Sequence, residues 1–260
     1  MPRKWSRTWS RPSKTKVALA VVAALREELS ALLASASDVR EVSCAGRTFY
    51  RGRLQDQEVT LVLSGIGKVA AAATAALCID RFAARSMVFT GVAGGLAGPV
   101  LVGDVVVADA LLQHDMDARP LFSRWEVPLS GKTRFETDAA RSALLHQAAQ
   151  EVLAQPQGAR AAWGSGTSHR GLIVSGDVFV SSQAQSQALR QELPDALAVE
   201  MEGAAMAQVC ADFGCPLSVV RTISDRADDV AHVDFARFLQ DVAAELSRDI
   251  VLRALALGLR

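Results

Sequence analysis

The sequence predicts an α/β protein with a three-layer αβα architecture around a central mixed, mainly parallel, twisted sheet. Short, nearly continuous apolar runs recur along the chain, and most of them lead into a segment with helical periodicity. Such runs are typical of strands that helices cover on both faces. Six or more of these strands alternating with helices favour this fold class, and no internal repeat or linker divides residues 17–260. We therefore expect a single domain over 17–260.

Two strand-to-helix units open the chain. Residues 17–23 are nearly all apolar and pass directly into residues 25–33, whose leucines recur at helical spacing. The next apolar run leads through a Ser-Gly-Ile-Gly turn into an alanine-rich segment, and alanine is the strongest helix former. A third run ends in glycines, which let the backbone turn sharply or approach a ligand. The elements expected after residue 33 are a strand over 59–63, a helix over 68–82, and strands over 86–90 and 105–108.

The second half of the chain continues the alternation after a long polar stretch. Thr137 or Asp138 is a candidate N-cap for a helix, and the Gly, Ser and Gln content of residues 155–170 indicates a loop. Three further apolar runs indicate strands, and helical patterns follow them. The elements expected here are helices over 138–154, 182–191, 202–212 and 235–256, and strands over 172–174, 196–199 and 217–223.

Composition and charge limit the function classes. No stretch reaches the roughly 18 apolar residues that a membrane span needs. The formal net charge is zero, but residues 1–16 carry six basic residues and no acid, which leaves 22 basic and 28 acidic residues elsewhere. This acidic body argues against a nucleic-acid-binding protein. Residues 1–16 lack the apolar core of a secretory signal, so we expect a disordered leader, with contact to anionic partners as the alternative.

The cysteines and histidines indicate no metal site. The cysteines lack the paired spacing of zinc ligands, so we expect free and mostly buried thiols in a cytoplasmic protein. The histidines do not cluster with cysteines or acids at ligand spacing. We expect neither a metal nor an organic cofactor. The residues considered are Cys44, Cys78, Cys210, Cys215, His114, His146, His169 and His232.

Three carboxylates follow the ends of apolar strands, which is where open α/β sheets bind their ligands. Glu28 comes soon after the first strand, Glu202 follows the run 196–199, and Asp225 follows the run 217–223. Each has a structural alternative, because acids favourably face the dipole at a helix start and Asp or Ser residues cap turns. Alone, these positions indicate only a site for a small polar molecule.

A second carboxylate accompanies Glu202. Glu200 and Glu202 are alternate residues of an extended segment and so share one side of it. Two carboxylates on one side repel each other unless a cation offsets them, and Arg221 on a later strand is an available partner. We expect Glu200 to be a structural partner of Arg221.

Six motifs occur in order along the chain, at residues 64–71, 90–96, 102–106, 171–177, 199–202 and 223–225, and they carry a resemblance to a known family. Together they resemble the 5'-methylthioadenosine/S-adenosylhomocysteine nucleosidases of the purine nucleoside phosphorylase superfamily, over residues 17 to about 256. The resemblance implies a nucleoside phosphorylase-like fold, a homodimer and a role in methionine salvage. It also implies hydrolysis of the N-glycosidic bond of 5'-methylthioadenosine and S-adenosylhomocysteine, with 5'-deoxyadenosine as a further candidate.

The resemblance also implies a role for each site residue. Asp225 is the general acid that protonates adenine at N7, and Ser224 orients it. Glu28 activates the attacking water, and Glu202 binds the ribose hydroxyls, with Met201 against the sugar. These roles meet a physical need, because the departing base must be protonated and the cationic sugar stabilised. The remaining implied residues are Arg221, which holds the carboxylates; Phe179 and the Val180 backbone at adenine; Val92, Ala93 and Gly94 beside the ribose; and Ile66, Leu25 and Phe235 at the 5' end.

Several positions depart from the family pattern. Val92 stands where many members have Ser, so a hydroxyl near the ribose is missing and only backbone contact remains. Ala23 replaces a common Gly, and Leu25 a common Met. Residues 114–136 also depart from the pattern, and in relatives this segment helps to form the pocket for the 5' group. The preferred 5' group is therefore left open.

Three rival functions remain. A purine nucleoside phosphorylase shares the fold but needs a phosphate site. Arg26 is the one residue that favours such a site, and Glu28 would repel the phosphate. A futalosine-type nucleosidase uses the same scaffold, although the adenine-side residues fit the first family better. A catalytically silent nucleoside-binding protein would not need Glu28, Glu202 and Asp225 together.

Overall fold

The computed structural model describes residues 18–155, 166–229, 231, 235, 238 and 242–260. A mixed sheet forms its centre, with strand order β10-β6-β8-β9-β5-β1-β4-β3-β2 and the short β7 beside β6. The strands are β1 (Ala18–Ala23), β2 (Ser37–Cys44), β3 (Arg47–Leu54), β4 (Gln57–Leu63), β5 (Ala84–Gly95), β6 (Val105–Gln113), β7 (Phe135–Glu136), β8 (Ser168–Ser175), β9 (Ala196–Glu200) and β10 (Leu217–Asp225). The helices are α1 (Arg26–Ala34), α2 (Lys68–Asp80), α3 (Ala139–Leu153), α4 (Gln183–Glu192), α5 (Gly203–Phe213) and α7 (Ala244–Ala256).

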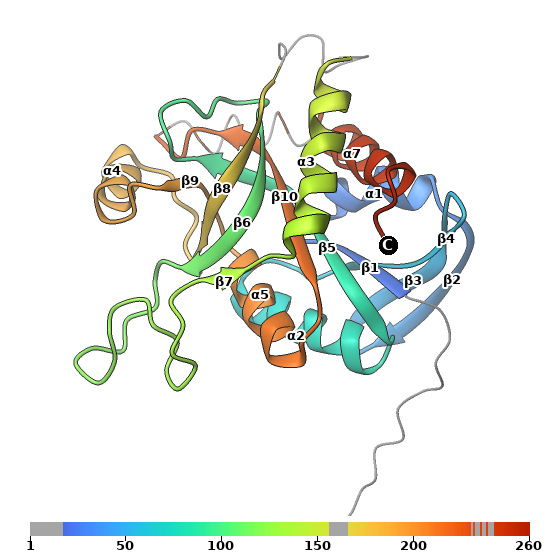
Figure 1. Cartoon of the computed structure of the whole chain (residues 1–260), viewed down its shortest axis with the longest axis horizontal. Helices are drawn as coiled ribbons and strands as arrows, with labels where there is room; N and C mark the ends of the chain where they lie inside the picture. The colour runs from blue at the N-terminus through green and yellow to red at the C-terminus, as the bar shows by residue number, and fades with distance from the viewer. Residues whose placement is uncertain (1–17, 156–165, 230, 232–234, 236–237, 239–241) are drawn as a thin grey trace, which may run out of the picture.

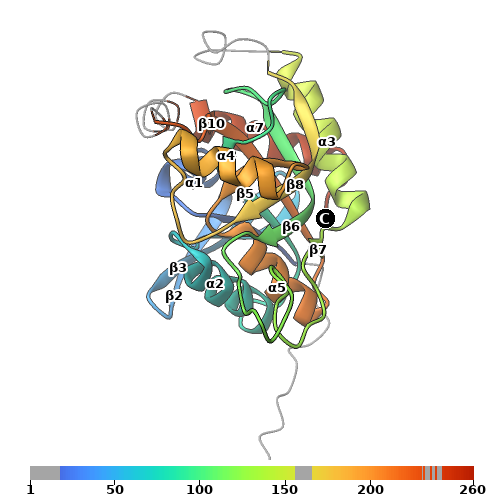
Figure 2. The same ribbon diagram turned by 90° about the vertical axis from the view of Figure 1, so that its left-hand side faces the viewer.

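The helices cover the sheet on two faces, which confirms the predicted three layers (Figure 1). On one face α7 packs against both α1 and α3, and these helices share an apolar core with alternate residues of β1 and β4. On the other face α2 packs against α5 over a second core. Helix α4 lies apart from both groups, against β8 (Figure 2). Alternation of side chains along each buried strand supplies both cores at once.

Part of the sheet closes on itself. Strand β10 pairs with β5 in parallel and with β6 antiparallel, while β5 also pairs with β9 antiparallel. Parallel pairings of β6 with β8 and of β8 with β9 complete the ring. The closure brings the ends of β5, β9 and β10 together, because Gly94 pairs with both Val199 and Asp225.

The sequence prediction missed the hairpin of β2 and β3. Its residues turn at Ala45 and Gly46, which both have positive φ angles, and the strands pair antiparallel at the edge of the sheet. All of β2 except Cys44 is exposed, so the hairpin has no apolar run of the kind used to find the other strands. Charged and exposed side chains on the edge strand β2, among them Arg40 and Glu41, oppose pairing with other chains.

Several predicted boundaries were too short. Strand β5 continues through the glycine segment 91–95, and β6 extends to Gln113 instead of ending at 108. Strand β8 begins at Ser168, inside the predicted loop 155–170, of which residues 156–165 lie outside the described part. These extensions are rich in glycine and polar residues, which are not typical of strands, although their backbone still pairs with neighbouring strands. The Asp138 cap is confirmed, because its side chain accepts a hydrogen bond from Arg141 N at 2.9 Å.

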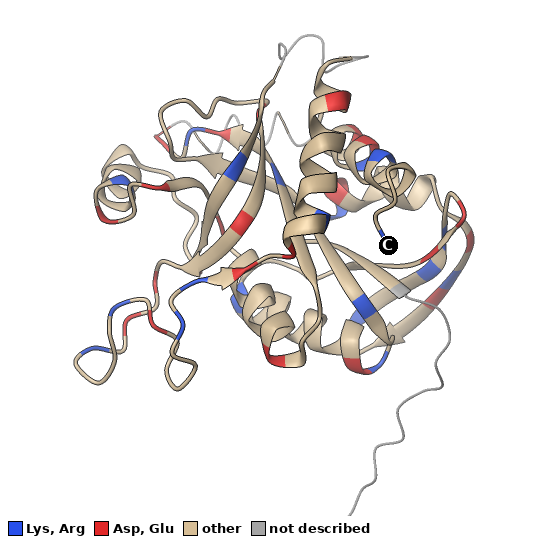
Figure 3. Ribbon diagram, in the orientation of Figure 1, with Lys and Arg blue, Asp and Glu red and all other residues tan. Residues whose placement is uncertain are grey.

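Charged residues of both signs are interspersed over the described ribbon (Figure 3). The four cysteines are free, and three of them are buried while Cys44 is half-buried, as expected. The predicted leader 1–16 and most of the first part of the helix predicted over 235–256 lie outside the described residues. Within the described residues, no helix is long and apolar enough to cross a membrane.

Candidate active site

A pocket of about 450 Å³ opens at the carboxyl ends of β1, β5, β9 and β10. It is lined by every predicted site residue except Arg221, which lies fully buried beneath it. Strands β1, β5 and β10 run parallel, so their carboxyl ends reach the same edge of the sheet. The lining residues are Ala24, Leu25, Glu28, Ile66, Val92, Ala93, Gly94, Val178, Phe179, Val180, Val199, Glu200, Met201, Glu202, Ser224, Asp225 and Phe235.

Glu28 lies in the first turn of α1 and is held by three backbone N–H groups. Its Oε2 accepts hydrogen bonds from Ala24 N at 2.9 Å and Leu25 N at 2.8 Å, and its Oε1 accepts one from Val92 N at 3.0 Å. Burial raises the pKa of Glu28, while the charge of Arg221 and these N–H groups act in the opposite direction. A fixed, desolvated carboxylate with a raised pKa suits proton abstraction.

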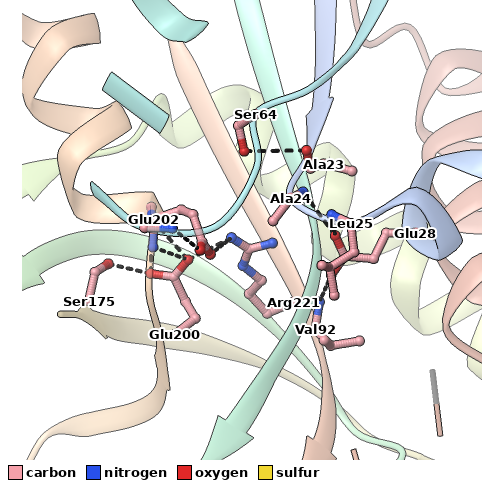
Figure 4. A network of polar contacts seen from close by, with 12 residues as sticks. Ala23, Ala24, Leu25, Glu28, Ser64, Val92, Ser175, Glu200, Glu202 and Arg221 are labelled. Carbon is pink, nitrogen blue, oxygen red and sulfur yellow. Dashed lines mark hydrogen bonds and ion pairs between the residues drawn. The ribbon is translucent and has the colours of Figure 1, made fainter. Parts of the chain in front are cut away.

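Arg221 lies between Glu28 on one side and Glu200 and Glu202 on the other (Figure 4). Its Nη2 donates to Glu200 Oε2 at 2.6 Å and is 3.8 Å from Glu202 Oε2. Its guanidinium also stacks over the Phe89 ring, with the Cζ atom 3.8 Å from the ring centroid. The predicted pairing of Arg221 with Glu200 is therefore confirmed.

Glu200 also organises the start of α5. It accepts hydrogen bonds from Gly203 N at 2.9 Å and Glu202 N at 3.1 Å, and from the Ser175 hydroxyl. Ser175 Oγ in turn accepts one from Ala204 N at 2.8 Å. The first N–H groups of a helix have no partner within the helix, so Glu200 and Ser175 together satisfy the start of α5. Ser175 is a contributor that sequence reasoning missed, although it belongs to the motif 171–177.

Glu202 is the N-cap residue of α5, with its side chain turned towards α2. Its Oε1 accepts a hydrogen bond from Gly67 N at 2.8 Å, just before α2 begins. Burial raises the pKa of Glu202 to about 8, and the nearby charge of Glu200 contributes in the same direction. Arg221 lowers that pKa, but the cation is engaged mainly by Glu200.

Asp225 ends β10 and faces the same pocket. The Ser224 hydroxyl lies 2.8 Å from Asp225 Oδ2, and Asp225 Oδ1 accepts a hydrogen bond from Ala227 N at 2.8 Å. Gly94 allows this arrangement, since a Cβ there would lie 2.9 Å from Asp225 Oδ1. The contact between Ser224 and Asp225 that was expected is therefore present, and Asp225 also caps the following turn through Ala227 N.

The mouth of the pocket is apolar. Phe179 and Phe235 meet edge to face with ring centroids 5.7 Å apart, and both line the pocket with Leu25 and Ile66. Ile66 and Phe179 are 59% and 41% exposed, so a bound molecule would cover apolar surface there.

The lining contains no basic side chain among the described residues. Arg26, which could have favoured a phosphate site, is exposed and is not part of the lining. No group of His, Cys, Asp and Glu residues in the described part of the chain is arranged to hold a metal ion.

Comparisons with known proteins agree with this geometry. The family model of the phosphorylase superfamily matches residues 18–256. A 5'-methylthioadenosine/S-adenosylhomocysteine nucleosidase of Geobacillus thermodenitrificans is 38% identical over 237 residues, which cover 91% of this chain and 95% of the relative. The chain belongs to this nucleosidase family within the phosphorylase superfamily.

Solved structures share the family fold. The S-adenosylhomocysteine nucleosidase of Streptococcus pyogenes, solved with 5-methylthiotubericidin, matches with a TM-score of 0.82 and 33% identity, covering 93% of this chain and 97% of that one. The futalosine hydrolase of Helicobacter pylori matches with the same TM-score and 32% identity, covering 93% of this chain and 98% of that one. Fold similarity therefore identifies the nucleosidase scaffold and does not separate these two substrate classes.

Proposed function

We propose that this nucleosidase hydrolyses the N-glycosidic bond of 5'-methylthioadenosine and S-adenosylhomocysteine, with 5'-deoxyadenosine as a further candidate. The observation that carries the proposal is that Glu28, Glu202 and Asp225 line one pocket whose mouth is apolar and aromatic. An adenosine with a thioether at C5' has a matching division into a polar ribose, a stacking base and an apolar sulfur group beside C5'. The names of the curated relatives support the same substrates.

Asp225 is the proposed general acid. As the bond from C1' of ribose to N9 of adenine breaks, its electrons move into the base, which accepts a proton from Asp225 at N7. The Ser224 hydroxyl, 2.8 Å from Asp225 Oδ2, is suited to orient the carboxyl group. Protonation of the leaving group lowers the barrier because an anionic purine leaves poorly.

Glu28 is the proposed base and Glu202 the proposed ribose ligand. The attacking water forms a bond to C1' and gives a proton to Glu28, whose burial excludes competing solvent. Glu202 would bind the ribose hydroxyls by hydrogen bonds that strengthen as the sugar becomes cationic, because the growing positive charge favours the carboxylate form of Glu202. Met201 would lie against the sugar, with backbone contacts from Val92, Ala93 and Gly94.

The aromatic residues complete the proposed assignment. Phe179 would stack on adenine, and the backbone of Val180 would read its edge. Leu25, Ile66 and Phe235 would surround the 5' group. Their apolar character suits the thioether that 5'-methylthioadenosine and S-adenosylhomocysteine share next to C5'.

One experiment tests substrate and mechanism together. The purified protein is incubated with 5'-methylthioadenosine, S-adenosylhomocysteine, 5'-deoxyadenosine and futalosine, with and without inorganic phosphate, and release of free base is followed. We expect rapid release of adenine from the first two, independent of phosphate. A requirement for phosphate would make the protein a phosphorylase, and preference for futalosine would assign it to the other hydrolase class.

We also propose that residues 17–260 act as one domain and that the enzyme is a cytoplasmic homodimer. The family match over 18–256 supports the first statement, and the free cysteines support a reducing compartment. Val69, Leu121 and Leu129 are at least 82% exposed, and contact with a second copy would bury apolar surface of this kind. A monomeric mass in solution at full activity would overturn the dimer.

A further inference from the structure

The segment that carries Phe179 is joined to the start of α2 by Asp177. Asp177 follows the end of β8 and stands two residues before Phe179. Its Oδ1 accepts a hydrogen bond at 2.7 Å from the backbone N of Lys68, the first residue of α2. The N-cap residue of α2 is Gly67, which has no side chain to cap the helix. Asp177 therefore supplies from a distant loop the acceptor that the helix start lacks.

The fit at this junction is close. Gly67 has a φ of +95°, and a Cβ on it would lie 3.0 Å from Asp177 Oδ1. On the other side of the segment, a Cβ on Gly176 would lie 2.5 Å from Cε1 of the His114 ring. Glycine at both positions lets the loop after β8 approach α2 and the end of β6.

A second link reinforces the first through Asp115. The backbone N of Asp177 donates to Asp115 Oδ2 at 3.0 Å, and Lys68 Nζ donates to Asp115 Oδ1 at 2.7 Å. Lys68 Nζ also reaches Gln113 Oε1 at 3.2 Å. Burial raises the pKa of Asp115, but the hydrogen bonds from Lys68 and the Asp177 backbone and the charge of Lys68 together outweigh burial and lower the pKa, which keeps this acid ionised. Lys68 is thus linked to the loop after β8 twice. Its backbone N–H donates to the Asp177 side chain, and its ammonium group binds Asp115, which accepts from the Asp177 backbone.

The same helix start also holds the ribose side of the pocket. Gly67 N donates to Glu202 Oε1 at 2.8 Å, and the next N–H, that of Lys68, donates to Asp177 Oδ1. Two successive N–H groups of the chain therefore fix the proposed ribose ligand and the loop of the proposed adenine-stacking residue. The motif 171–177 ends in Asp177, yet none of the assigned roles uses this residue.

We propose that Asp177 is a positioning residue that holds the segment 178–180 against the start of α2, so that Phe179 is fixed over the purine. The inference rests on the proposed function for the identity of the base. Stacking on Phe179 acts alike on bound substrate and on the transition state, so its loss should raise KM and leave kcat nearly unchanged. Base stacking on an aromatic side chain contributes enough to binding to allow a large effect on KM.

The test compares three variants with 5'-methylthioadenosine as substrate. Asp177→Ala removes the acceptor and should raise KM about tenfold, with kcat within about threefold of wild type. Asp177→Asn keeps an oxygen that accepts from Lys68 N and should restore KM to within about threefold of wild type. Asp138→Ala is the matched control, since Asp138 caps α3 through Arg141 N without lining the pocket. It should lower the melting temperature and leave KM unchanged.

A spectroscopic readout separates this inference from the substrate proposal. The fluorescent adenine isomer 2-aminopurine loses emission when it stacks on an aromatic ring. We expect quenching by wild type, Asp177→Asn and Asp138→Ala, and weak quenching by Asp177→Ala. If wild type releases no base from methylthioadenosine, the proposed function fails while quenching still tests the positioning role. Equal quenching and equal KM for Asp177→Ala and Asp138→Ala would reduce Asp177 to a helix cap.

A double-mutant cycle tests the second link. Asp115→Ala and Asp177→Ala should each raise KM, and the double variant should raise it by less than the product of the two factors, because both act on one junction. Multiplicative effects would show that Asp115 does not act through Asp177.

Discussion

Arg221 is shared unequally between two buried carboxylates, since its Nη2 lies 2.6 Å from Glu200 Oε2 and 3.8 Å from Glu202 Oε2. Glu200 is thereby neutralised by a direct ion pair, and Glu202 feels the cation only at longer range. Burial, together with the charge of Glu200, raises the pKa of Glu202 to about 8, and Arg221 lowers it only in part. The geometry of the Arg221 and Glu200 pair thus contributes to the electrostatics of the proposed ribose ligand.

Replacing Arg221 should destabilise the protein strongly. Arg221→Met leaves Glu200 buried without its cation, and breaking a buried pair in this way costs about 3–5 kcal/mol. The matched control is Arg170→Met, because Arg170 pairs with Asp109 in a partly exposed position where a pair contributes about 0–1 kcal/mol. Urea unfolding of the three proteins measures both values. Similar midpoints for the two variants would mean that the buried pair does not stabilise the fold.

The raised pKa of Glu202 predicts a pH dependence of stability. The folded protein keeps a proton on Glu202 up to a pH of about 8, whereas the unfolded chain releases it near 4.5. Between these values the folded state binds more protons, so this group makes the free energy of unfolding fall as pH rises, by up to about 1.4 kcal/mol per pH unit. The group has no such effect below pH 4.5 or above pH 8.

Glu202→Gln isolates this contribution, because Gln cannot titrate. The free energy of unfolding of wild type minus that of Glu202→Gln should be smaller at pH 7.5 than at pH 5.5. Denaturant titrations at both pH values measure this difference. A difference that grows with pH would mean that folding lowers the pKa of Glu202, with the carboxylate held as an ion.

Glu28→Gln should cost stability as well as turnover. The carboxylate accepts hydrogen bonds from Ala24, Leu25 and Val92 through both of its oxygens, and an amide can accept through only one. At least one buried N–H then faces the amide group, at a cost of about 1–3 kcal/mol. Glu27→Gln is the control, since Glu27 is exposed in the same helical turn.

Turnover and chemical unfolding are measured on both variants. We expect Glu28→Gln to abolish base release and to unfold at lower denaturant, and Glu27→Gln to match wild type in both. Near-normal turnover in Glu28→Gln would remove this residue from the proposed role of base. A loss of turnover with unchanged stability would show that the amide is accommodated and that the effect is chemical.

The sequence predicts the central strands well because they are buried on both faces and so consist of apolar runs, as β1 shows. It does not predict the hairpin of β2 and β3, whose side chains are largely exposed, or the closure through β10 and β5. The closure depends on pairings between segments that lie far apart in the chain. The sequence of one strand does not indicate which other strand it pairs with.

The site divides in the same way. The pocket residues follow strand ends and match ordered motifs, so their positions can be inferred from the sequence alone. The interactions between them cannot, because the motif 171–177 includes Ser175 without indicating its partner, and only the structure shows its hydrogen bond to Glu200. Asp177 likewise gives no signal in the sequence that its partner is Lys68 N, 109 positions away.

Gly91 should be the glycine of the site that least tolerates a side chain. A Cβ on Gly91 would lie 2.5 Å from Glu28 Oε1 and closer still to Arg221 Nη1, and its φ of +152° is one that other residues rarely adopt. Gly91→Ala must therefore push Glu28 and Arg221 away from their positions. Displacement of the proposed base by even 1 Å can cost about a hundredfold in rate, and we expect at least that loss of kcat.

Gly98→Ala is the control, since a Cβ there meets no atom within 4 Å, and it should retain activity and melting temperature. Steady-state base release and thermal unfolding of both variants measure these effects. If Gly91→Ala were as active as Gly98→Ala, the close approach of Glu28, Gly91 and Arg221 would not be needed for catalysis.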